Sequence, residues 1–250
     1  MASLQVPLQF RKFQILCLFV LVLLIAFSLV ALFPPAAIAC GEDECSANSA
    51  NAYDCTSQGG IWNSVTCSCR NMSPIIISLS RDGYDLTSAS DGVAFDLNAD
   101  GIPDQIAWTS IHSDDAFLVL DRNSNGRIDN GKELFGNITD QPSSPQRNGF
   151  LALAVFDKPE NGGNGDGIID EHDAVYSLLR LWRDSNHNGI SEANELSILP
   201  ASGVYSISLD FRTSFRIDRN GNVFRYRSRV NEGMHSSVAF WAYDVFFATQ

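Results

Sequence analysis

The 250-residue sequence is short of positive charge, with 17 lysine and arginine residues against 29 aspartate and glutamate residues. Its formal net charge is −12. A protein this acidic lacks the basic surplus that neutralises phosphate groups, so we expect no nucleic-acid partner. Hydrophobic residues make up 45% of the chain, which argues against wholesale disorder and allows one or two packed domains.

The sequence motifs of common enzyme classes are also missing. The four histidines form no H-E-x-x-H or triad pattern, and there is no G-x-S-x-G elbow or phosphate-binding loop. Asp114 and Asp115 could act as an acid pair in glycoside hydrolysis, but no spacing separates an acid from a base. We therefore expect no catalytic residue. A secreted hydrolase that uses carboxylates not bound to metal is the less favoured alternative.

Cysteine is absent after Cys69, and most cysteines lie close together. The group comprises Cys40, Cys45, Cys55, Cys67 and Cys69. This clustering predicts a disulfide-stapled segment over residues 40–73, if the chain is exported. A zinc site is disfavoured because paired C-x2-C knuckles and a nearby histidine are missing. Cleavage before Cys40 leaves five cysteines, whereas lipidation of Cys40 leaves four for two bridges, so the pairing stays open.

Residues 1–39 have the pattern of a signal peptide. Two basic residues precede an uncharged apolar run at 15–33, and Ala37-Ile38-Ala39 fits an A-x-A cleavage site. Two alternatives stay open, namely an uncleaved membrane anchor formed by 15–33 and a lipid attached to Cys40. All three predict a bacterial protein that is secreted or held at the cell surface, with membrane attachment only through its N-terminus.

The pattern from residue 74 onward predicts an α+β domain over 74–250. Short apolar or alternating segments predict strands at 75–79, 93–95, 105–108, 116–120, 204–209, 223–230 and 238–247. Helical spacing begins at Phe150, and it is clearest at 173–183, where Val175, Leu179 and Trp182 would share one face with Leu178. We expect helices over 149–199 and antiparallel strands over 203–248.

The negative charge is concentrated in residues 82–195, which hold 21 acidic and 7 basic residues, a net charge of −14. Four loops in this stretch share the pattern D/N-x-[DN]-x-[DN]-G. Ca²⁺ takes six to eight oxygen ligands, which side chains at positions 1, 3 and 5 of a tight loop can supply. Glycine at position 6 permits the bend, position 7 offers its carbonyl, and a later carboxylate closes the site. The loops are therefore predicted to bind Ca²⁺.

Each loop offers its own set of candidate ligands. Loop 1 supplies Asp96, Asn98, Asp100 and Asp104. Loop 2 supplies Asp121, Asn123, Asn125, Arg127, Asp129 and Glu133. Loop 3 supplies Asp157, Asn164, Asp166, Ile168, Asp170 and Asp173. Loop 4 supplies Asp184, Asn186, Asn188, Ile190, Glu192 and Glu195.

The loops match the calcium pattern to different degrees. Loop 4 matches best, although Ser191 stands where an aliphatic residue is usual. Loop 3 needs Asp157 to reach across an insertion, and Glu133 of loop 2 comes one residue late. Pro103 excludes an ordinary helix after loop 1, which is either a calcium turn or a plain hairpin turn. We expect loops 3 and 4 to pair through the helix at 173–183.

These loops and their flanking residues resemble a known module. Residues 74–209, including Glu133-Leu134-Phe135-Gly136 and Leu181-Trp182-Arg183-Asp184, are similar to the EF-hand-type calcium-binding module of bacterial secreted proteins. Similar modules accompany RTX-type haemolysin repeats. The resemblance implies calcium and an extracytoplasmic setting, but no reaction. The glycine-rich nonapeptides of RTX β-rolls are missing, so no β-roll is expected.

The sequence thus predicts an exported calcium-binding protein whose loops stabilise a surface or secreted domain. Because several ligands are neutral asparagines, we expect weak sites with Kd on the order of 10⁻⁴–10⁻³ M. A dockerin-like module that offers helix 173–183 to a protein partner is the alternative. Arginines within 212–229 either face water, meet an anionic partner such as a cell-envelope polymer, or pair with acids of the calcium-binding region. Asp218 to Asn222 is predicted to be a hairpin turn without metal.

Overall fold

A computed structural model describes residues 61–63, 68–70, 72–231 and 240–249 of the chain. The chain divides into a unit of residues 1–44 and a unit of residues 45–250, and every described residue belongs to the second. The predicted signal segment and the cysteine side chains lie outside the described residues, so the predictions of export and disulfides remain predictions. Within the described ranges, no helix is long and apolar enough to cross a bilayer.

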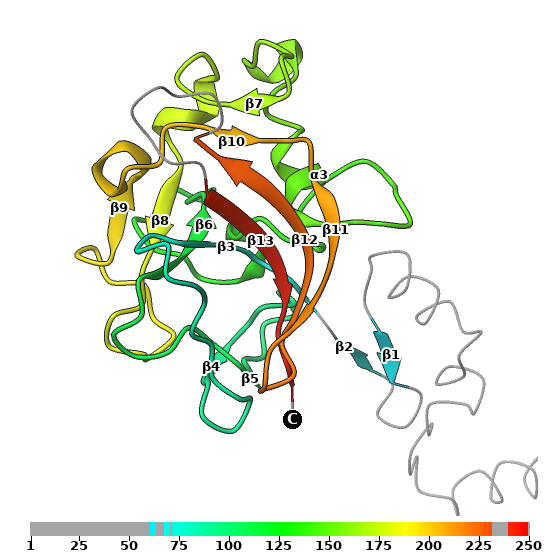
Figure 1. Cartoon of the computed structure of the whole chain (residues 1–250), viewed down its shortest axis with the longest axis vertical. Coiled ribbons are helices and arrows are strands. Elements are labelled where there is room, and N and C mark those ends of the chain that lie inside the picture. The colour runs from blue at the N-terminus through cyan, green and yellow to red at the C-terminus, as the bar shows by residue number, and fades with distance from the viewer. Residues whose placement is uncertain (1–60, 64–67, 71, 232–239, 250) are drawn as a thin grey trace, which may run out of the picture. The chain divides into compact units, whose positions relative to one another are not determined.

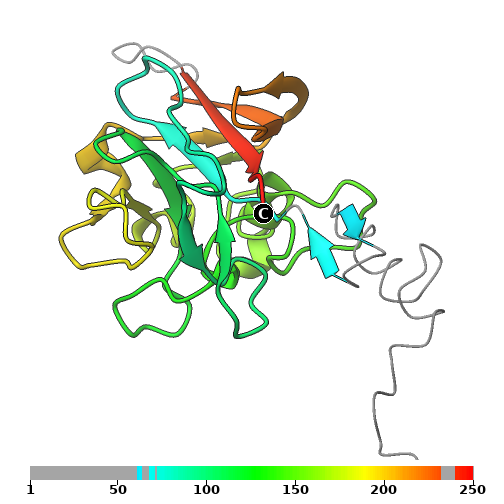
Figure 2. The ribbon, with the colours of Figure 1, turned by 90° about the horizontal axis from the view of Figure 1, so that it is seen from below.

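A curled antiparallel sheet of nine strands forms the main element of the second unit (Figures 1 and 2). The strand order is β7-β10-β12-β13-β3-β6-β8-β9, and β11 also pairs with β12. The strands are β3 (Ile75–Ser78), β6 (Asp115–Val119), β7 (Ile168–Ile169), β8 (Arg180–Trp182), β9 (Leu196–Ile198), β10 (Ile207–Ser208), β11 (Arg212–Ile217), β12 (Val223–Val230) and β13 (Phe240–Phe246). Two hairpins are separate from it, β1 (Ile61–Asn63) with β2 (Ser68–Arg70) and β4 (Val93–Phe95) with β5 (Asp104–Ile106).

The central strands of the sheet are buried on both faces. Side chains alternate between the two faces of a strand, so Ile75 and Ile77 of β3 enter one hydrophobic core while Ile76 enters the other. In β6, Leu118 belongs to the first core and Phe117 to the second. β3 and β6 therefore read as continuously apolar runs in the sequence. The strands predicted at 75–79, 93–95, 105–108, 116–120 and 223–230 are confirmed.

Helix is scarce, and the prediction of an α+β fold is wrong. The described residues contain a single α-helix, α3 (Gly149–Leu153), whose first N–H groups are capped by the side chain of Asn148. The other helical segments are short 3₁₀ turns: η1 (Gly131–Glu133), η2 (Pro159–Asn161), η3 (Ala174–Ser177) and η4 (Leu199–Ser202). The described part of the chain is mostly β.

The helix predicted at 173–183 is replaced by η3 and β8. Leu178 is 58% exposed, whereas Leu181 and Trp182 are buried on opposite faces of the sheet. β8 pairs with β6 on one side and with β9 on the other. Pairing on both edges satisfies the backbone of β8 and buries adjacent residues, so tertiary contacts override the local helical spacing.

Candidate metal-binding loops

Loop 4 is anchored by Asp184, which is 2% exposed. Its Oδ1 accepts the N–H of Asn188 at 3.1 Å, and its Oδ2 accepts the N–H of Gly189 at 2.8 Å. The indole N–H of Trp108 also donates to Oδ2, at 2.8 Å. A residue of the hydrophobic core therefore fixes the first acid of this loop.

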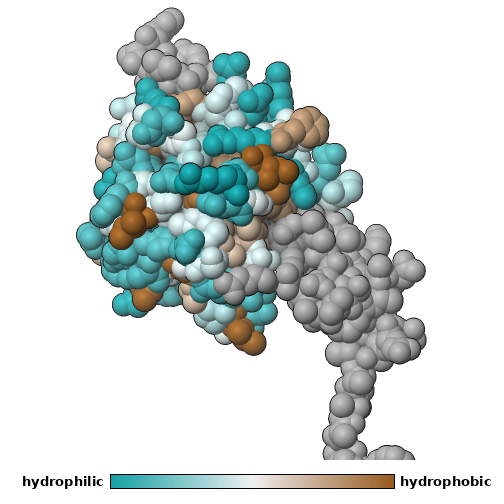
Figure 3. All heavy atoms as spheres, turned by 60° about the horizontal axis from the view of Figure 1, so that its bottom comes forward, coloured by the Kyte–Doolittle hydropathy of each residue, from teal (hydrophilic) through white to brown (hydrophobic). Residues whose placement is uncertain are grey.

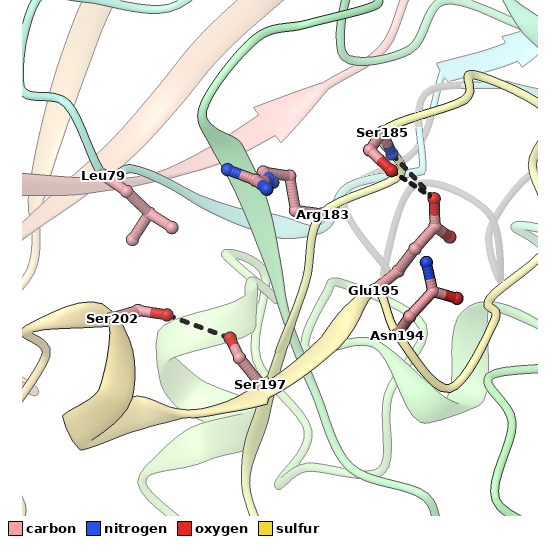
Figure 4. Close-up of a pocket in the computed structure, with 7 residues that line it drawn as sticks. All are labelled: Leu79, Arg183, Ser185, Asn194, Glu195, Ser197 and Ser202. Carbon is pink, nitrogen blue, oxygen red and sulfur yellow. Dashed lines mark hydrogen bonds between the residues drawn. The ribbon is translucent and has the colours of Figure 1, made fainter.

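Glu195, which follows loop 4, is held in the same manner. Its Oε1 accepts the N–H and the hydroxyl of Ser185 at 2.8 and 2.9 Å. Its Oε2 accepts the indole N–H of Trp182 at 3.3 Å and the N–H of Glu192 at 3.4 Å. Figure 4 shows the Glu195 carboxylate turned toward Ser185, beside a small cavity of about 170 Å³. Both oxygens are thus occupied by donors from the loop and the core.

The middle of loop 4 brings two amides to one carboxylate. The side-chain amides of Asn186 and Asn188 donate to Oε1 of Glu192 at 3.4 and 2.9 Å. The Asn188 bond lowers the pKa of Glu192. Oε2 of Glu192 is enclosed and meets no donor among the described residues. Among the enclosed side-chain atoms of this loop that the structure describes, it alone has no hydrogen-bond partner.

Loop 2 repeats the arrangement. Asp121 accepts the N–H groups of Asn125 and Gly126 at 3.2 and 2.8 Å. The amides of Asn123 and Asn125 donate to Oδ2 of Asp129 at 2.9 and 2.6 Å. The carboxylate of Glu133, 4% exposed, accepts N–H groups from the loop, including that of Asp129 at 2.7 Å. Although Glu133 is one residue late, it still closes the loop.

Loop 1 has the same turn with less support. Asp96 accepts the N–H groups of Asp100 and Gly101 at 3.0 Å each. The amide of Asn98 donates to Asp100 at 2.9 Å and to Asp104 at 3.3 Å. Asp100 and Asp104 are exposed. The loop joins β4 to β5 as a hairpin turn, so no later acid returns to it from a helix.

Loop 3 reaches its first acid across the insertion. Asp157 accepts the N–H of Gly165 through Oδ1 and that of Gly167 through Oδ2, both at 3.0 Å. Asp173 accepts the N–H of Asp170 at 2.9 Å and that of Asn164 at 3.3 Å, and burial raises its pKa. Asp157 and Asp173 thus enclose loop 3 from its two ends.

Within the part of the chain that the structure describes, hydrogen bonds between loops join loop 4 to loop 2, and not to loop 3. The N–H of Ile128 in loop 2 donates to the Ser191 hydroxyl at 2.6 Å. The N–H of Gly131, just after loop 2, donates to the carbonyl of Asp96 at 2.9 Å. Loop 3 instead bonds toward β10, through Leu209 N–H to the Gly167 carbonyl at 2.8 Å. The predicted pairing of loops 3 and 4 through a helix is therefore wrong.

Sequence reasoning missed the core side chains that hold the loop acids. Trp108 and Trp182 lie 5.5 Å apart within an aromatic cluster, and each donates to an acid of loop 4. Nothing in the local sequence links Trp108 to a loop that begins 76 residues later. Ser191 did carry a signal, because it breaks the aliphatic preference at its position and its hydroxyl meets loop 2.

Carboxylates alone do not form a metal centre in any loop. Among the described residues, no group of three or more histidine, cysteine, aspartate or glutamate side chains could hold a metal ion. Each loop instead combines three or four acids with asparagine amides and backbone carbonyls. Those neutral oxygens would have to complete the coordination of an ion, as they do in many calcium sites.

The arginines of β12 lie over aromatic rings. The Arg225 guanidinium lies 4.0 Å from the ring centre of Phe246, and that of Arg227 lies 4.4 Å from that of Trp241. Such cation–π contacts stabilise by about 0.5–1 kcal/mol at exposed sites. They hold these arginines against aromatic side chains of the neighbouring strand β13.

Two further acids are buried in the sheet rather than in the loops. Asp244 of β13 accepts the N–H of Gly149 through Oδ2, and Asp115 of β6 accepts that of Asp85. In each acid, Oδ1 meets no donor among the described residues. Burial raises the pKa of both carboxyl groups to about 7.

Comparison with known proteins places this architecture in a family. A family model described as the SPM domain matches residues 75–248, so the chain belongs to the SPM domain family. The chain is also 40% identical over 152 residues to the iron-regulated protein FrpA of Neisseria meningitidis serogroup C. That match covers 60% of this chain and 13% of the relative, so the chain spans only a small part of the relative's length.

The resemblance to an EF-hand-type module is overturned by these findings. The family match is to the SPM domain, and the described residues hold one short α-helix instead of helices flanking each loop. The loops share the EF-hand spacing because tight turns with aspartate, asparagine and glycine use the same backbone geometry whether strands or helices flank them.

Proposed function

We propose that this protein is an exported calcium-binding protein whose loops hold Ca²⁺ and thereby stabilise a secreted or surface domain. The observation that carries the proposal is the centre of loop 4. There an enclosed oxygen of Glu192 has no donor, and two asparagine amides crowd the other oxygen. A cation bound there would give this oxygen the partner that it lacks.

The chemistry of the loop side chains suits calcium. In loop 4 the ion would be held by Asp184, Asn186, Asn188, Glu192 and Glu195 with the carbonyl of Ile190. These are oxygen donors of mixed charge, which Ca²⁺ accepts in flexible geometry, whereas Mg²⁺ demands near-ideal octahedral geometry. Loops 1, 2 and 3 offer the same kind of set. The asparagine amides would have to turn their oxygens toward the ion, which is consistent with weak binding.

The effect of calcium follows from linkage. An ion that binds only the folded chain stabilises it by RT ln(1 + [L]/Kd), about 2.7 kcal/mol at a hundred times Kd. Loop 2 bonds to loop 4 through Ile128 and Ser191, and to loop 1, the turn of the β4–β5 hairpin, through Gly131 and Asp96. Ordering them by calcium would therefore stabilise one whole end of the sheet.

A stabilising role is better supported than a docking role. The helix that was expected to offer an apolar face is absent, and Val175 and Leu179 are buried. On the face seen in Figure 3, hydrophobic residues form separate spots within a hydrophilic surface. A docking site usually needs a contiguous apolar patch.

Thermal unfolding of the full chain in calcium, magnesium and EDTA tests the proposal. We expect calcium to raise Tm well above its value in EDTA, and magnesium to raise it much less. Asp184→Ala and Glu195→Ala should reduce the shift caused by calcium. Asp218→Ala is the matched control, because Asp218 accepts N–H groups in a similar turn that has no later acid. A wild-type Tm that ignores calcium would overturn the proposal.

A further inference from the structure

One serine side chain joins two of the candidate calcium loops. The hydroxyl of Ser191 in loop 4 accepts the N–H of Ile128 in loop 2 at 2.6 Å, and it donates to the carbonyl of the same residue at 3.5 Å. Both residues are 3% exposed. The backbone of loop 2 therefore meets a side chain of loop 4 in the protein interior, where a hydrogen bond is stronger than in water.

This contact lies between candidate ligands in both loops. Ile128 and Ser191 occupy the same place in their loops, two residues after the glycine that forms the bend. A candidate ligand stands on each side of each of them. The flanking ligands are the Arg127 carbonyl and Asp129 in loop 2, and the Ile190 carbonyl and Glu192 in loop 4. A change in the position of Ile128 is thus passed to a segment of loop 4 that carries two ligands.

Loop 3 provides an internal comparison, because its corresponding residue is bound to the sheet instead. Ile169 follows Gly167 by two residues, and it pairs with Ile207 of β10. Among the hydrogen bonds of the described residues, none joins loop 3 to loop 2 or to loop 4. The same place in the loop therefore leads to another loop in one case and to the sheet in the other.

We propose that loops 2 and 4 bind Ca²⁺ cooperatively through the contact between Ser191 and Ile128, and that loop 3 binds independently of them. This proposal rests on the proposed function, in which these loops hold calcium. Occupation of loop 2 fixes the segment around Ile128, and the buried contact then fixes the segment around Ser191. Loop 4 is thereby ordered in advance and binds more tightly, because it has less conformational freedom to lose.

A coupling of this kind is reciprocal. If occupation of loop 2 raises the calcium affinity of loop 4 by some factor, occupation of loop 4 raises that of loop 2 by the same factor. Couplings between two sites are typically about 5- to 150-fold. Because a single side chain carries this one, we expect the low end of that range, about fivefold.

A glycine N–H in each loop reports the state of that loop. Each of these groups donates to the first acid of its loop, so occupation of the loop changes its chemical environment. The reporters are Gly101 with Asp96, Gly126 with Asp121, Gly167 with Asp157, and Gly189 with Asp184. NMR spectroscopy of the full chain with isotopically labelled glycine therefore follows calcium binding to the four loops separately.

Disabling loop 2 tests the coupling in one direction. In Asp121→Ala, the calcium concentration at the midpoint of the Gly189 signal should rise about fivefold, while the midpoint of the Gly167 signal should stay unchanged. Asp157→Ala is the matched control, because it removes the first acid of loop 3 in the same way. We expect it to leave the midpoint of Gly189 where it is.

Disabling loop 4 tests the coupling in the reverse direction. In Asp184→Ala, the midpoint of the Gly126 signal should rise by the same factor of about five, as reciprocity requires. This measurement needs no substitution of Ser191, so the pair of loops can be tested even if Ser191→Ala does not fold.

Ser191→Ala tests the contact itself. It removes the hydroxyl but no candidate ligand, so both loops should still bind calcium. In this background, Asp121→Ala should no longer move the midpoint of Gly189. Ser197→Ala is the matched control, because it removes a hydroxyl that bonds to Ser202 instead of to loop 2, and it should preserve the coupling.

The possible failures are distinguishable. Absence of a calcium response at all the reporter glycines would overturn the proposed function and the coupling with it. Calcium responses with a Gly189 midpoint that ignores Asp121→Ala would overturn the coupling alone. An equal shift in Asp157→Ala would show a general loss of stability and would also overturn it. A coupling that survives Ser191→Ala would show that the two loops communicate without this contact, which contradicts the proposal.

Discussion

The buried acids of loop 4 and the buried acids of the sheet differ in their hydrogen bonds. Both oxygens of Asp184 accept donors, including an indole N–H and loop N–H groups. Asp244 is as deeply buried, yet one of its oxygens has no donor among the described residues, and burial raises its pKa to about 7. At similar burial, the two acids thus differ in the number of donors that reach them.

Removing the best-held acid should have the largest effect. Asp184→Ala leaves the indole N–H of Trp108 and the N–H groups of Asn188 and Gly189 without their acceptor. At about 1 kcal/mol for each lost bond, the free energy of unfolding should fall by about 3 kcal/mol even in EDTA. Urea unfolding followed by circular dichroism measures this change.

The same substitution in loop 1 provides the control. Asp96→Ala frees the N–H groups of Asp100 and Gly101, which are exposed and can bond to water. We expect a loss of at most about 1 kcal/mol. Equal losses in the two variants would mean that support from the core does not distinguish the loops.

Replacing an acid that has one unsatisfied oxygen should stabilise the protein instead. The pKa of Asp244 is about 7 in the folded chain, above its unfolded value of 3.8. Between these values the unfolded chain releases a proton that the folded chain retains, so stability falls as pH rises from about 4 to about 7. Asp244→Asn removes this loss and should stabilise the protein by about 2 kcal/mol above neutrality.

The measurement compares urea unfolding of wild type and Asp244→Asn at pH about 5 and about 8, at fixed calcium. The advantage of the variant should grow with pH. An advantage that shrinks as pH rises would contradict the raised pKa.

Trp108→Phe should lower the free energy of unfolding by less than Asp184→Ala does. Phenylalanine keeps an aromatic ring in the core cluster but cannot donate to Asp184. We expect a loss of about 1 kcal/mol together with a weaker response to calcium. Trp241→Phe is the matched control, because Trp241 contacts arginine guanidinium groups instead of a loop acid. Equal calcium responses in the two variants would show that the indole N–H of Trp108 does not contribute to calcium binding.

The sequence predicted the strands and the turns better than their assembly. Continuous apolar runs marked β3 and β6, and the spacing of aspartate, asparagine and glycine located all four loops. The prediction of a helix at 173–183 failed because the sheet pairs β8 on both edges, which periodicity within one segment cannot reveal. The indole donors and the contact of loop 2 with loop 4 also depend on residues far apart in the chain.

Calcium titration of wild type and Asp184→Ala by calorimetry, on the full chain in chelator-treated buffer, tests the central claim most directly. The account predicts saturable calcium binding by wild type and loss of at least one binding event in the variant. Magnesium should not reproduce the wild-type isotherm. Absence of calcium binding in wild type, or an isotherm that Asp184→Ala leaves unchanged, would contradict it.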